Sequence, residues 1–414
     1  MHEKIEIALL GRKLGHSLSG EIHKYLGSYD YRLYPLEPEE LDGFFVRNDF
    51  RGLNVTIPYK LDVVKYCSEL SETAKRIGCV NTVVRREDGS FFGDNTDYYG
   101  FSYMAKKAGI SFEGKKVLIL GNGGASLTAR LVAADMGAES VVIVARKLED
   151  NFTNIQKHSD AQIIVNCTPV GMYPNNGERL VDLGVFSELE GVLDMIYNPA
   201  RTPMLLDAAD RGVKYANGLT MLVAQAAKSA EYFRQDGDSY ADIDEIVDKI
   251  SLAQKNIVFV GMPGCGKSTL AVALASKLGK EYIDTDDMIV DKTGKTIPEI
   301  FADEGETYFR DVESECIKEA AKQSGKVIAT GGGAILRPEN RDAIRGNSFV
   351  VFLKRDIPEL SKKGRPLSKD ISALKEMYKL RLPLYELTAD AEIDICEKQE
   401  DTLNNLLELL ESMQ

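Results

Sequence analysis

Two stretches decide the fold: KKVLILGNGGASLTARLVAADMG at residues 115–137 and KNIVFVGMPGCGKSTLAVALASKLG at residues 255–279. Each has a short hydrophobic segment, then a glycine-rich turn, then an amphipathic segment with helical spacing. A buried strand followed by a tight turn and a helix has this pattern, and the amino terminus of such a helix is suited to bind phosphate. Both stretches therefore predict a phosphate-binding strand–turn–helix unit in an α/β fold.

The length and composition favour a globular protein of several domains. The chain has 414 residues, of which 44% are hydrophobic and 28% charged, and domains of about 100–200 residues predict two to four of them. Strand-like and helix-like segments alternate nearly throughout, which favours parallel sheets with helical crossovers. A polar stretch at 235–239 and a helix-like segment at 241–255 precede the second unit, so we place the main boundary near 251–255.

The charge and the cysteines limit the expected partners and compartment. Sixty-four acidic against fifty-one basic residues give a formal charge of -13, which argues against nucleic acid but allows small anions to bind at a few basic groups. No stretch has the length and apolarity of a membrane span or a secretory signal. The six cysteines are scattered and the four histidines lack metal-ligand spacing, so we expect reduced thiols in a cytoplasmic protein. The sequence leaves open whether copies of the chain form a homo-oligomer.

The first glycine-rich turn has the spacing of a dinucleotide-binding site. GNGGAS at 121–126 fits G-x-G-x-x-[GAS] directly after VLIL at 117–120. The first glycine allows a tight turn, the second lets the backbone approach a pyrophosphate, and the next helix supplies N–H donors. The alternative is an ordinary tight turn. The predicted cofactor contacts here are Gly121, Asn122, Gly123, Gly124 and Ala125.

Two basic residues after the next strand favour NADP(H) over NAD(H). The strand-like VVIV at 141–144 is followed by Ala145, Arg146 and Lys147, where an NAD site usually has Asp or Glu for the ribose hydroxyls. Arg146 and Lys147 suit a 2′-phosphate instead, the alternative being that both are solvated basic residues.

Six blocks within residues 1–250 resemble shikimate dehydrogenase, in the order that this family has. They are GRKLGHSLS at 11–19, NVTIPYK at 54–60, GCVNTV at 78–83, GDNTD at 93–97, NCTPVGM at 166–172 and NGLTMLVAQAA at 217–227. The resemblance implies NADPH-dependent reduction of 3-dehydroshikimate to shikimate. It also implies a substrate-binding domain of residues 1–102 with 219–250, and a Rossmann-like NADP-binding domain of residues 103–218.

The resemblance assigns roles to individual residues. Lys60 and Asp97 match the family's catalytic pair, in which an ammonium group can protonate the developing alkoxide and a neighbouring carboxylate can orient it. The positions that match substrate contacts are Ser17 and Ser19 for the carboxylate, and Thr56, Asn81, Tyr197 and Gln225 for the rest. Gly218 and Met221 match positions beside the cofactor. Outside the motifs, residues of these types more often cap, turn or fill a core.

Three features depart from that family. Gly20 stands where proline is common after HSxS, and Ala145 replaces the usual asparagine. Only nineteen residues separate Arg146 from Asn166. Because that interval is too short for a full helix–strand–helix unit, we expect one strand of the nucleotide-binding sheet to be missing or reduced.

The second glycine-rich turn satisfies the P-loop pattern. GMPGCGKS at 261–268 fits G-x-x-x-x-G-K-[ST] after the strand-like IVFV at 257–260. Backbone N–H groups of such a loop surround nucleotide phosphates, the lysine reaches the β- and γ-oxygens, and the serine holds magnesium. The predicted ATP contacts are Gly264, Cys265, Gly266, Lys267, Ser268 and Thr269, with Ser268 also a ligand of Mg²⁺.

Motifs downstream of the P-loop resemble shikimate kinase over residues 256–414. They are DTD at 284–286, FRD at 309–311, GGG at 331–333, RPL at 365–367 and RLPLY at 381–385. The resemblance implies a P-loop kinase domain with a parallel sheet at residues 255–414, which phosphorylates shikimate with ATP.

This second resemblance also assigns roles. It places Asp284 near Mg²⁺, makes Asp286 both a contact of the ring hydroxyls and the proton acceptor, and makes Arg365 a lid residue over the phosphates. The remaining implied substrate contacts are Arg310 and Arg381 for the carboxylate, and Gly331, Gly332 and Gly333, where a Cβ would intrude on the substrate. The lid segment at 357–370 is short and lacks the additional arginine that many relatives place against the adenine.

The two halves predict one bifunctional enzyme of the shikimate pathway, which leads to the aromatic amino acids, because the product of the first reaction is the substrate of the second. Two alternatives stay open. In the first alternative, one half is catalytically silent and acts as a binding or regulatory module. In the second, the oxidoreductase uses quinate as its substrate and NAD as its cofactor.

Overall fold

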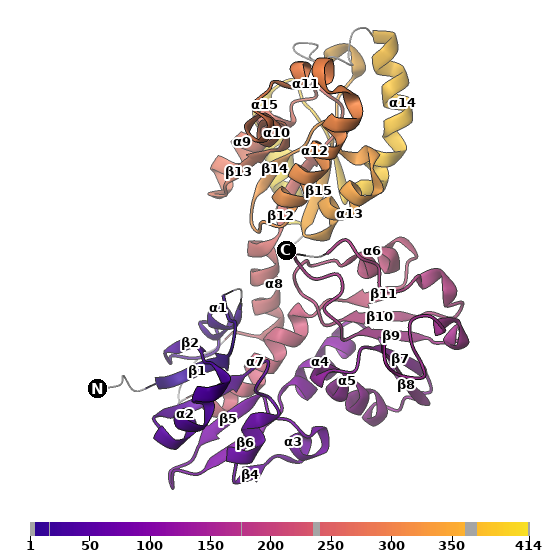
Figure 1. The fold of residues 1–414 in the computed structure, drawn as a ribbon. Helices are drawn as coiled ribbons and strands as arrows, with labels where there is room; N and C mark the ends of the chain where they lie inside the picture. The colour runs from indigo at the N-terminus through magenta and orange to yellow at the C-terminus, as the bar shows by residue number, and fades with distance from the viewer. Residues whose placement is uncertain (1–4, 16, 175, 235–240, 361–370, 413–414) are drawn as a thin grey trace. The chain divides into compact units, whose positions relative to one another are not determined.

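The computed structural model describes residues 5–15, 17–174, 176–234, 241–360 and 371–412, and it confirms the predicted α/β class (Figure 1). The chain divides into two compact units. The first comprises Met1–Pro169, Leu180–Tyr197 and Asp207–Ile250, and the second comprises Val170–Arg179, Asn198–Leu206 and Ser251–Gln414. Two sheets belong to the first unit and one sheet to the second.

The first sheet has six strands in the order β2-β1-β3-β5-β6-β4. They are β1 (Ile5–Gly11), β2 (Tyr31–Pro35), β3 (Phe50–Val55), β4 (Glu69–Leu70), β5 (Thr82–Arg85) and β6 (Phe91–Asp94). The expectation of parallel pairing is wrong for part of this sheet, because β5 is antiparallel to both β3 and β6. The turn between β5 and β6 explains this. Gly89 has φ +83°, and the side chain of Asp88 accepts a hydrogen bond from the backbone N–H of Ser90. An Asp-Gly pair of this kind is typical of the tight turn of a β-hairpin.

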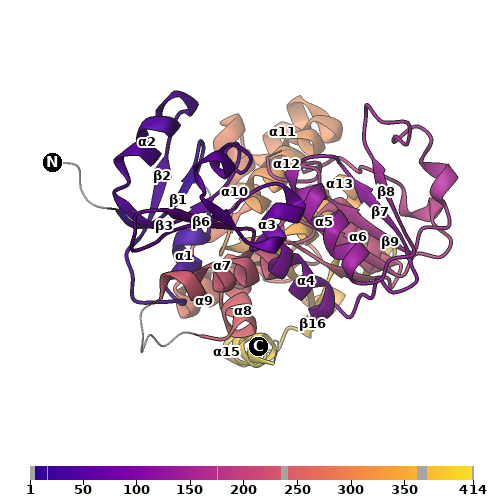
Figure 2. The ribbon, with the colours of Figure 1, turned by 90° about the horizontal axis from the view of Figure 1, so that it is seen from below.

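The second sheet has five parallel strands in the order β11-β10-β9-β7-β8. They are β7 (Lys116–Leu120), β8 (Ser140–Val144), β9 (Ile163–Asn166), β10 (Gly191–Asp194) and β11 (Lys214–Ala216). Helix α5 (Gly124–Asp135) follows β7 directly and packs on β7 and β8 (Figure 2). Between β8 and β9, where the structure describes every residue, the chain forms one 3₁₀ helix (Ile155–His158) and no further strand, which agrees with the expectation that one strand of this sheet is missing or reduced.

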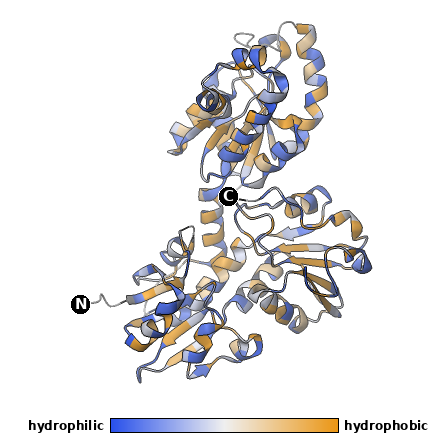
Figure 3. Cartoon of the chain, in the orientation of Figure 1, coloured by the Kyte–Doolittle hydropathy of each residue, from blue (hydrophilic) through white to orange (hydrophobic). Residues whose placement is uncertain are grey.

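The third sheet, in the second unit, also has five parallel strands, in the order β13-β14-β12-β15-β16. They are β12 (Asn256–Val260), β13 (Tyr282–Asp284), β14 (Val327–Ala329), β15 (Ser348–Lys354) and β16 (Ala391–Asp394). The strands of this sheet are largely hydrophobic (Figure 3), as expected for parallel strands covered by helices. The helices of the unit are α9 (Lys267–Leu278), α10 (Thr285–Thr293), α11 (Ile297–Asp303), α12 (Gly305–Ala321), α13 (Pro338–Gly346), α14 (Ile371–Thr388) and α15 (Gln399–Glu411).

The remaining helices of the first unit include a closely packed pair. They are α1 (Ser19–His23), α2 (Leu41–Arg47), α3 (Glu72–Ile77), α4 (Asp97–Lys107) and α7 (Leu219–Phe233), while α6 (Pro203–Asp210) and α8 (Ile243–Gln254) each have residues in both units. Helix α4 packs closely on α7 at Gly100, where a Cβ would lie 2.5 Å from the backbone oxygen of Met221 and 2.9 Å from Cβ of Gln225. This contact brings the first turn of α4 next to the first two turns of α7.

Other predictions concern cysteines and membranes. All six cysteines are free thiols, as expected. Among the described residues, no helix combines the length and the apolar character that crossing a membrane requires.

Candidate active sites

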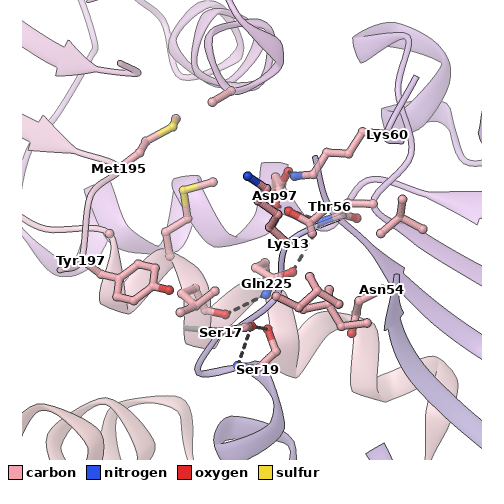
Figure 4. Close-up of a pocket in the computed structure, with 18 of the residues that line it drawn as sticks. Lys13, Ser17, Ser19, Asn54, Thr56, Lys60, Asp97, Met195, Tyr197 and Gln225 are labelled. Carbon is pink, nitrogen blue, oxygen red and sulfur yellow. Dashed lines mark hydrogen bonds and ion pairs between the residues drawn. The ribbon is translucent and has the colours of Figure 1, made fainter. Parts of the chain in front are cut away.

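A cavity of about 460 Å³ in the first unit collects most of the predicted reductase residues (Figure 4). Its lining includes all eight residues that the sequence assigned to catalysis or substrate binding in this half, Ser17, Ser19, Thr56, Lys60, Asn81, Asp97, Tyr197 and Gln225. The cofactor-side residues Ala125, Gly218 and Met221 line the same cavity. The residues predicted to bind the substrate and those predicted to bind the cofactor therefore line the same cavity.

Lys60 and Asp97 form an ion pair in this cavity. The ammonium nitrogen of Lys60 lies 2.5 Å from Oδ2 of Asp97, and the two side chains are 28% and 14% exposed. Asp97 is the first residue of α4, where the helix dipole favours a negative charge. The ion pair therefore holds the ammonium group of Lys60 at the cavity, where it is able to donate a proton.

A buried network fixes the other oxygen of Asp97. The side-chain amide of Asn81 donates to Oδ1 of Asp97 at 2.9 Å, and Oδ1 of Asn81 accepts from the backbone N–H of Thr96 at 2.8 Å. The amide oxygen of Gln225, on α7, lies 3.5 Å from both Nδ2 of Asn81 and Oγ1 of Thr96. The closeness of α4 and α7 at Gly100 makes this junction sterically feasible.

The polar groups around the pair are mostly neutral hydroxyls. Ser17 donates to Oγ of Ser19 at 3.1 Å, in the loop between β1 and α1. Thr56 follows β3, and its Cγ2 would lie 2.5 Å from a Cβ at Gly11, so glycine is required there. Burial raises the pKa of Tyr197, which keeps its phenol neutral. These groups suit a substrate that carries a carboxylate and several hydroxyls.

The structure adds lining residues that the sequence did not single out, among them Lys13, Asn54 and Met195. Asn54 and Thr56 are two residues apart at the end of β3, so strand alternation places them on one face. That signal could have identified Asn54. No comparable signal marks Lys13 or Met195.

The glycine-rich turn after β7 fits a dinucleotide. Gly121 has φ +104°, and a Cβ on it would lie 2.9 Å from Cγ2 of Thr168, so only glycine suits this position. A Cβ at Gly123 or Gly124 would meet nothing within 4 Å. No side chain caps the amino terminus of α5, which leaves backbone donors for a pyrophosphate.

Arg146 and Lys147 lie at the same edge of the sheet as this turn. The backbone N–H of Gly121 bonds to the carbonyl of Val144 at 2.8 Å, and both basic residues follow β8 and are exposed. This position suits a phosphate on the ribose of a nucleotide bound at the turn.

A buried histidine, His23, is linked to the cavity through Tyr31, and we expect it to make the first unit sensitive to acid. The ring of His23 stacks on Tyr31 at 3.8 Å, and Tyr31 donates to Oδ1 of the cavity residue Asn54 at 2.9 Å. Burial lowers the pKa of His23 from 6.5 to about 3. Below pH 6.5 the unfolded chain therefore binds a proton at this histidine, whereas the folded chain binds it only at about pH 3. Between these two pH values the free energy of unfolding falls as the pH drops, by up to about 1.4 kcal/mol per pH unit.

We expect hydrogen–deuterium exchange of the peptide covering residues 19–26 to report this loss, as a lower free energy of opening at pH 5 than at pH 7. In His23→Gln the difference between the two pH values is expected to shrink. Equal pH dependence in the wild-type chain and the variant would contradict the assignment.

In the second unit, Lys267 lies inside the P-loop. Its ammonium group donates to the carbonyls of Gly261 at 2.8 Å and Met262 at 3.0 Å, and the side chain is buried. Positive φ angles at Gly261, Gly264 and Gly266 shape the loop. The side chain of Cys265 is buried in the core, so only its backbone is able to contact a phosphate.

Ser268 and Asp284 fit a magnesium ion that keeps water and phosphate ligands. Oγ of Ser268 donates to Oδ2 of Asp284 at 2.7 Å, and the phenol of Tyr282 donates to the same oxygen at 2.8 Å. One hydroxyl and one carboxylate are typical of Mg²⁺ bound together with nucleotide phosphates. No group of three or more His, Cys, Asp or Glu within the described ranges forms a metal cluster of its own. Tyr282 was not predicted from the sequence.

Asp286 lies beside this pair and has an unpaired carboxylate oxygen. Burial raises the pKa of Asp286 to about 6; the charge of Asp284 adds to the shift and the charge of Lys267 opposes it. Among the described residues, Oδ1 of Asp286 has no hydrogen-bond partner. A buried carboxylate of this kind is suited to accept a proton from a bound hydroxyl near neutral pH.

Arg310 is held by a buried carboxylate that the sequence analysis did not single out. Glu313, one helical turn further along α12 and 1% exposed, accepts from Arg310 at 2.8 Å, and Glu306 accepts at 3.0 Å. Burial raises the pKa of Glu313, partly offset by the positive charge of Arg310. This pairing fixes the guanidinium group in one orientation. Helical spacing of Arg310 and Glu313 was the available signal.

The three glycines at 331–333 make room for side chains of the site itself. A Cβ at Gly331 would lie 2.7 Å from Oδ1 of Asp286, one at Gly332 2.5 Å from the ring of Pro263, and one at Gly333 2.2 Å from Arg310. Arg381 donates to the carbonyl of Gly332 at 2.9 Å. Asp286, Arg310, Arg381 and the glycines therefore form one cluster, whereas Arg365 lies outside the described residues.

Two family models match this chain. Residues 9–83 match the shikimate dehydrogenase substrate binding domain, and residues 263–411 match shikimate kinase.

Relatives of known name match the first part of the chain. A shikimate dehydrogenase (NADP(+)) of Clostridium perfringens strain SM101 is 37% identical over 253 residues, which cover 54% of this chain and 90% of the relative. The crystal structure of a chorismate mutase/shikimate 5-dehydrogenase fusion protein from Clostridium acetobutylicum is 36% identical, with a TM-score of 0.55, covering 60% of this chain and 98% of the other. A shikimate 5-dehydrogenase from Thermus thermophilus, in complex with NADP(H) and shikimate, is 30% identical, with a TM-score of 0.53 and coverage of 59% and 97%.

Proposed function

This chain belongs to the shikimate dehydrogenase family, and from that premise we propose that it reduces 3-dehydroshikimate to shikimate with NADPH and then phosphorylates shikimate with ATP. The observation that carries the first activity is the ion pair of Lys60 and Asp97 in a cavity that also contains the cofactor-side residues. The kinase family match and the cluster around Asp286 support the second.

In the reductase site, each residue has a distinct task. Ser17 and Ser19 hold the substrate carboxylate, and Asn81 and Gln225 bind ring oxygens. Lys60 donates a proton to the oxygen of the carbonyl as that oxygen becomes an alkoxide, and Asp97 orients the ammonium group and accepts from a ring hydroxyl. NADPH, held at the turn of Gly121–Ala125 with its 2′-phosphate at Arg146, supplies the hydride when bound.

In the kinase site, Arg310 and Arg381 bind the carboxylate of shikimate, and Asp286 accepts the proton of the hydroxyl that attacks. Lys267 leaves the loop carbonyls for the oxygens of the transferred phosphoryl group and stabilises their charge. Ser268 and Asp284 would hold Mg²⁺, which neutralises phosphate charge when bound.

The decisive experiment is incubation of the full chain with 3-dehydroshikimate, NADPH, ATP and Mg²⁺, with detection of products by mass. We expect shikimate 3-phosphate with all components, and shikimate alone when ATP is omitted. Accumulation of shikimate in the complete mixture would refute the kinase proposal, and unchanged 3-dehydroshikimate would refute the reductase proposal.

Cofactor choice gives a separate prediction. Arg146→Ala is expected to lower kcat/KM for NADPH about tenfold and to leave that for NADH unchanged, because the guanidinium group contacts only the 2′-phosphate. Arg130→Ala, which removes an exposed arginine of α5, is the matched control. A wild-type preference for NADH, or for quinate over shikimate, would favour the quinate alternative instead.

A further inference from the structure

The reductase cavity contains a third charged residue besides the catalytic pair. Lys13 lies in the loop between β1 and α1, and Figure 4 shows it among the side chains that line the cavity. Lys13, Lys60 and Asp97 are the charged residues in the described lining. Because Lys60 and Asp97 neutralise each other at 2.5 Å, the net charge of the lining is that of Lys13.

No structural role accounts for Lys13. Its neighbour Arg12 forms an ion pair with Glu37 at 2.9 Å, but Lys13 forms no hydrogen bond or ion pair with any described residue. Its side chain is exposed and belongs to no hydrophobic cluster. An ammonium group without a partner at the rim of a cavity is available to a ligand.

The groups expected to hold the substrate carboxylate need such a charge. Ser17 and Ser19 are neutral, and Ser17 already donates to Oγ of Ser19 at 3.1 Å. Thr56 and Asn81 are neutral as well, and Nδ2 of Asn81 already donates to Asp97. A carboxylate bound only by these groups would lose hydration without meeting a net positive charge, which is unfavourable.

On the basis of the proposed reductase function, we propose that Lys13 binds the carboxylate of the substrate together with Ser17 and Ser19, and makes the cavity selective for anionic over neutral substrates. Lys13 acts in binding alone, because Lys60 supplies the proton. Its contribution is therefore the same before and during hydride transfer, so it affects KM and not kcat.

The test compares shikimate with its neutral methyl ester, both oxidised with NADP⁺ by the full chain in the absence of ATP. In Lys13→Met we expect KM for shikimate to rise about fivefold, with kcat within about twofold and KM for the ester unchanged, since a solvent-exposed charge pair has a modest effect. Lys13→Arg should keep the wild-type KM. Raising the salt concentration should raise KM for shikimate in the wild-type chain and much less in Lys13→Met.

Lys24→Met is the matched control, because Lys24 is exposed, lies outside the cavity and carries the same charge. An unchanged KM for shikimate in Lys13→Met, or an equal rise for the ester, would overturn the inference. So would a wild-type chain that oxidises acid and ester equally well. A wild-type chain that oxidises neither would instead refute the proposed reductase function.

Discussion

Replacing Lys60 with alanine is expected to lower kcat for reduction of 3-dehydroshikimate by about a hundredfold to ten-thousandfold, the range for loss of a general acid. The ammonium group of Lys60 lines the cavity and is held 2.5 Å from the carboxylate of Asp97. Without it no positioned group protonates the developing alkoxide, and Asp97 is left with an uncompensated negative charge that repels it.

The measurement is steady-state oxidation of NADPH by the full chain, with kinase activity on added shikimate assayed in the same preparation. Kinase activity should match the wild type, which shows that the second unit is intact, and an unchanged circular dichroism spectrum should show that the first unit is folded. Lys75→Ala is a suitable control, because Lys75 pairs with Glu72 at the surface. A reductase rate within a fewfold of the wild type would remove Lys60 from the mechanism.

The second large effect is expected in the kinase half. Lys267→Met should lower kcat/KM for ATP about a thousandfold, because a buried ammonium group at the P-loop is replaced by an uncharged side chain of similar size. The hydrogen bonds of Lys267 to Gly261 and Met262 are lost too, so circular dichroism and reductase activity should be compared with the wild type.

Lys277→Met, on the exposed face of the same helix α9, is the control for charge and helix propensity. Together, the Lys60 and Lys267 variants also decide whether one half is catalytically silent. If the Lys267 variant kept full kinase activity, the P-loop assignment would be wrong. If the wild-type chain lacked either activity, that half would be the binding or regulatory module that the sequence left open.

Much of the fold could be predicted because its signals are local. The strand, turn and helix around Gly121 and around Lys267 appear in the structure at the expected residues. The antiparallel β5–β6 hairpin was missed, although its Asp88-Gly89 turn was readable, because alternation of strands and helices elsewhere favoured parallel pairing.

The residues missed at the sites share one property, which is that their role depends on which side chains surround them in the folded chain. Glu313 matters because it is 1% exposed and faces Arg310. Tyr282 matters because its phenol reaches the carboxylate of Asp284. Lys13 matters because no described residue neutralises it, whereas Arg12 beside it is neutralised by Glu37.

The sequence by itself determined both glycine-rich turns, because contiguous backbone N–H groups and a helix terminus form them and a short run of glycines is enough to specify that geometry. Only the tertiary structure decided how the polar groups of the cavity meet. Asn81 and Gln225 are 144 residues apart and meet where α4 and α7 approach at Gly100. Packing of this kind depends on how whole helices and strands fit together, and so do the burial of a side chain and the net charge of a cavity. No local sequence pattern encodes these properties.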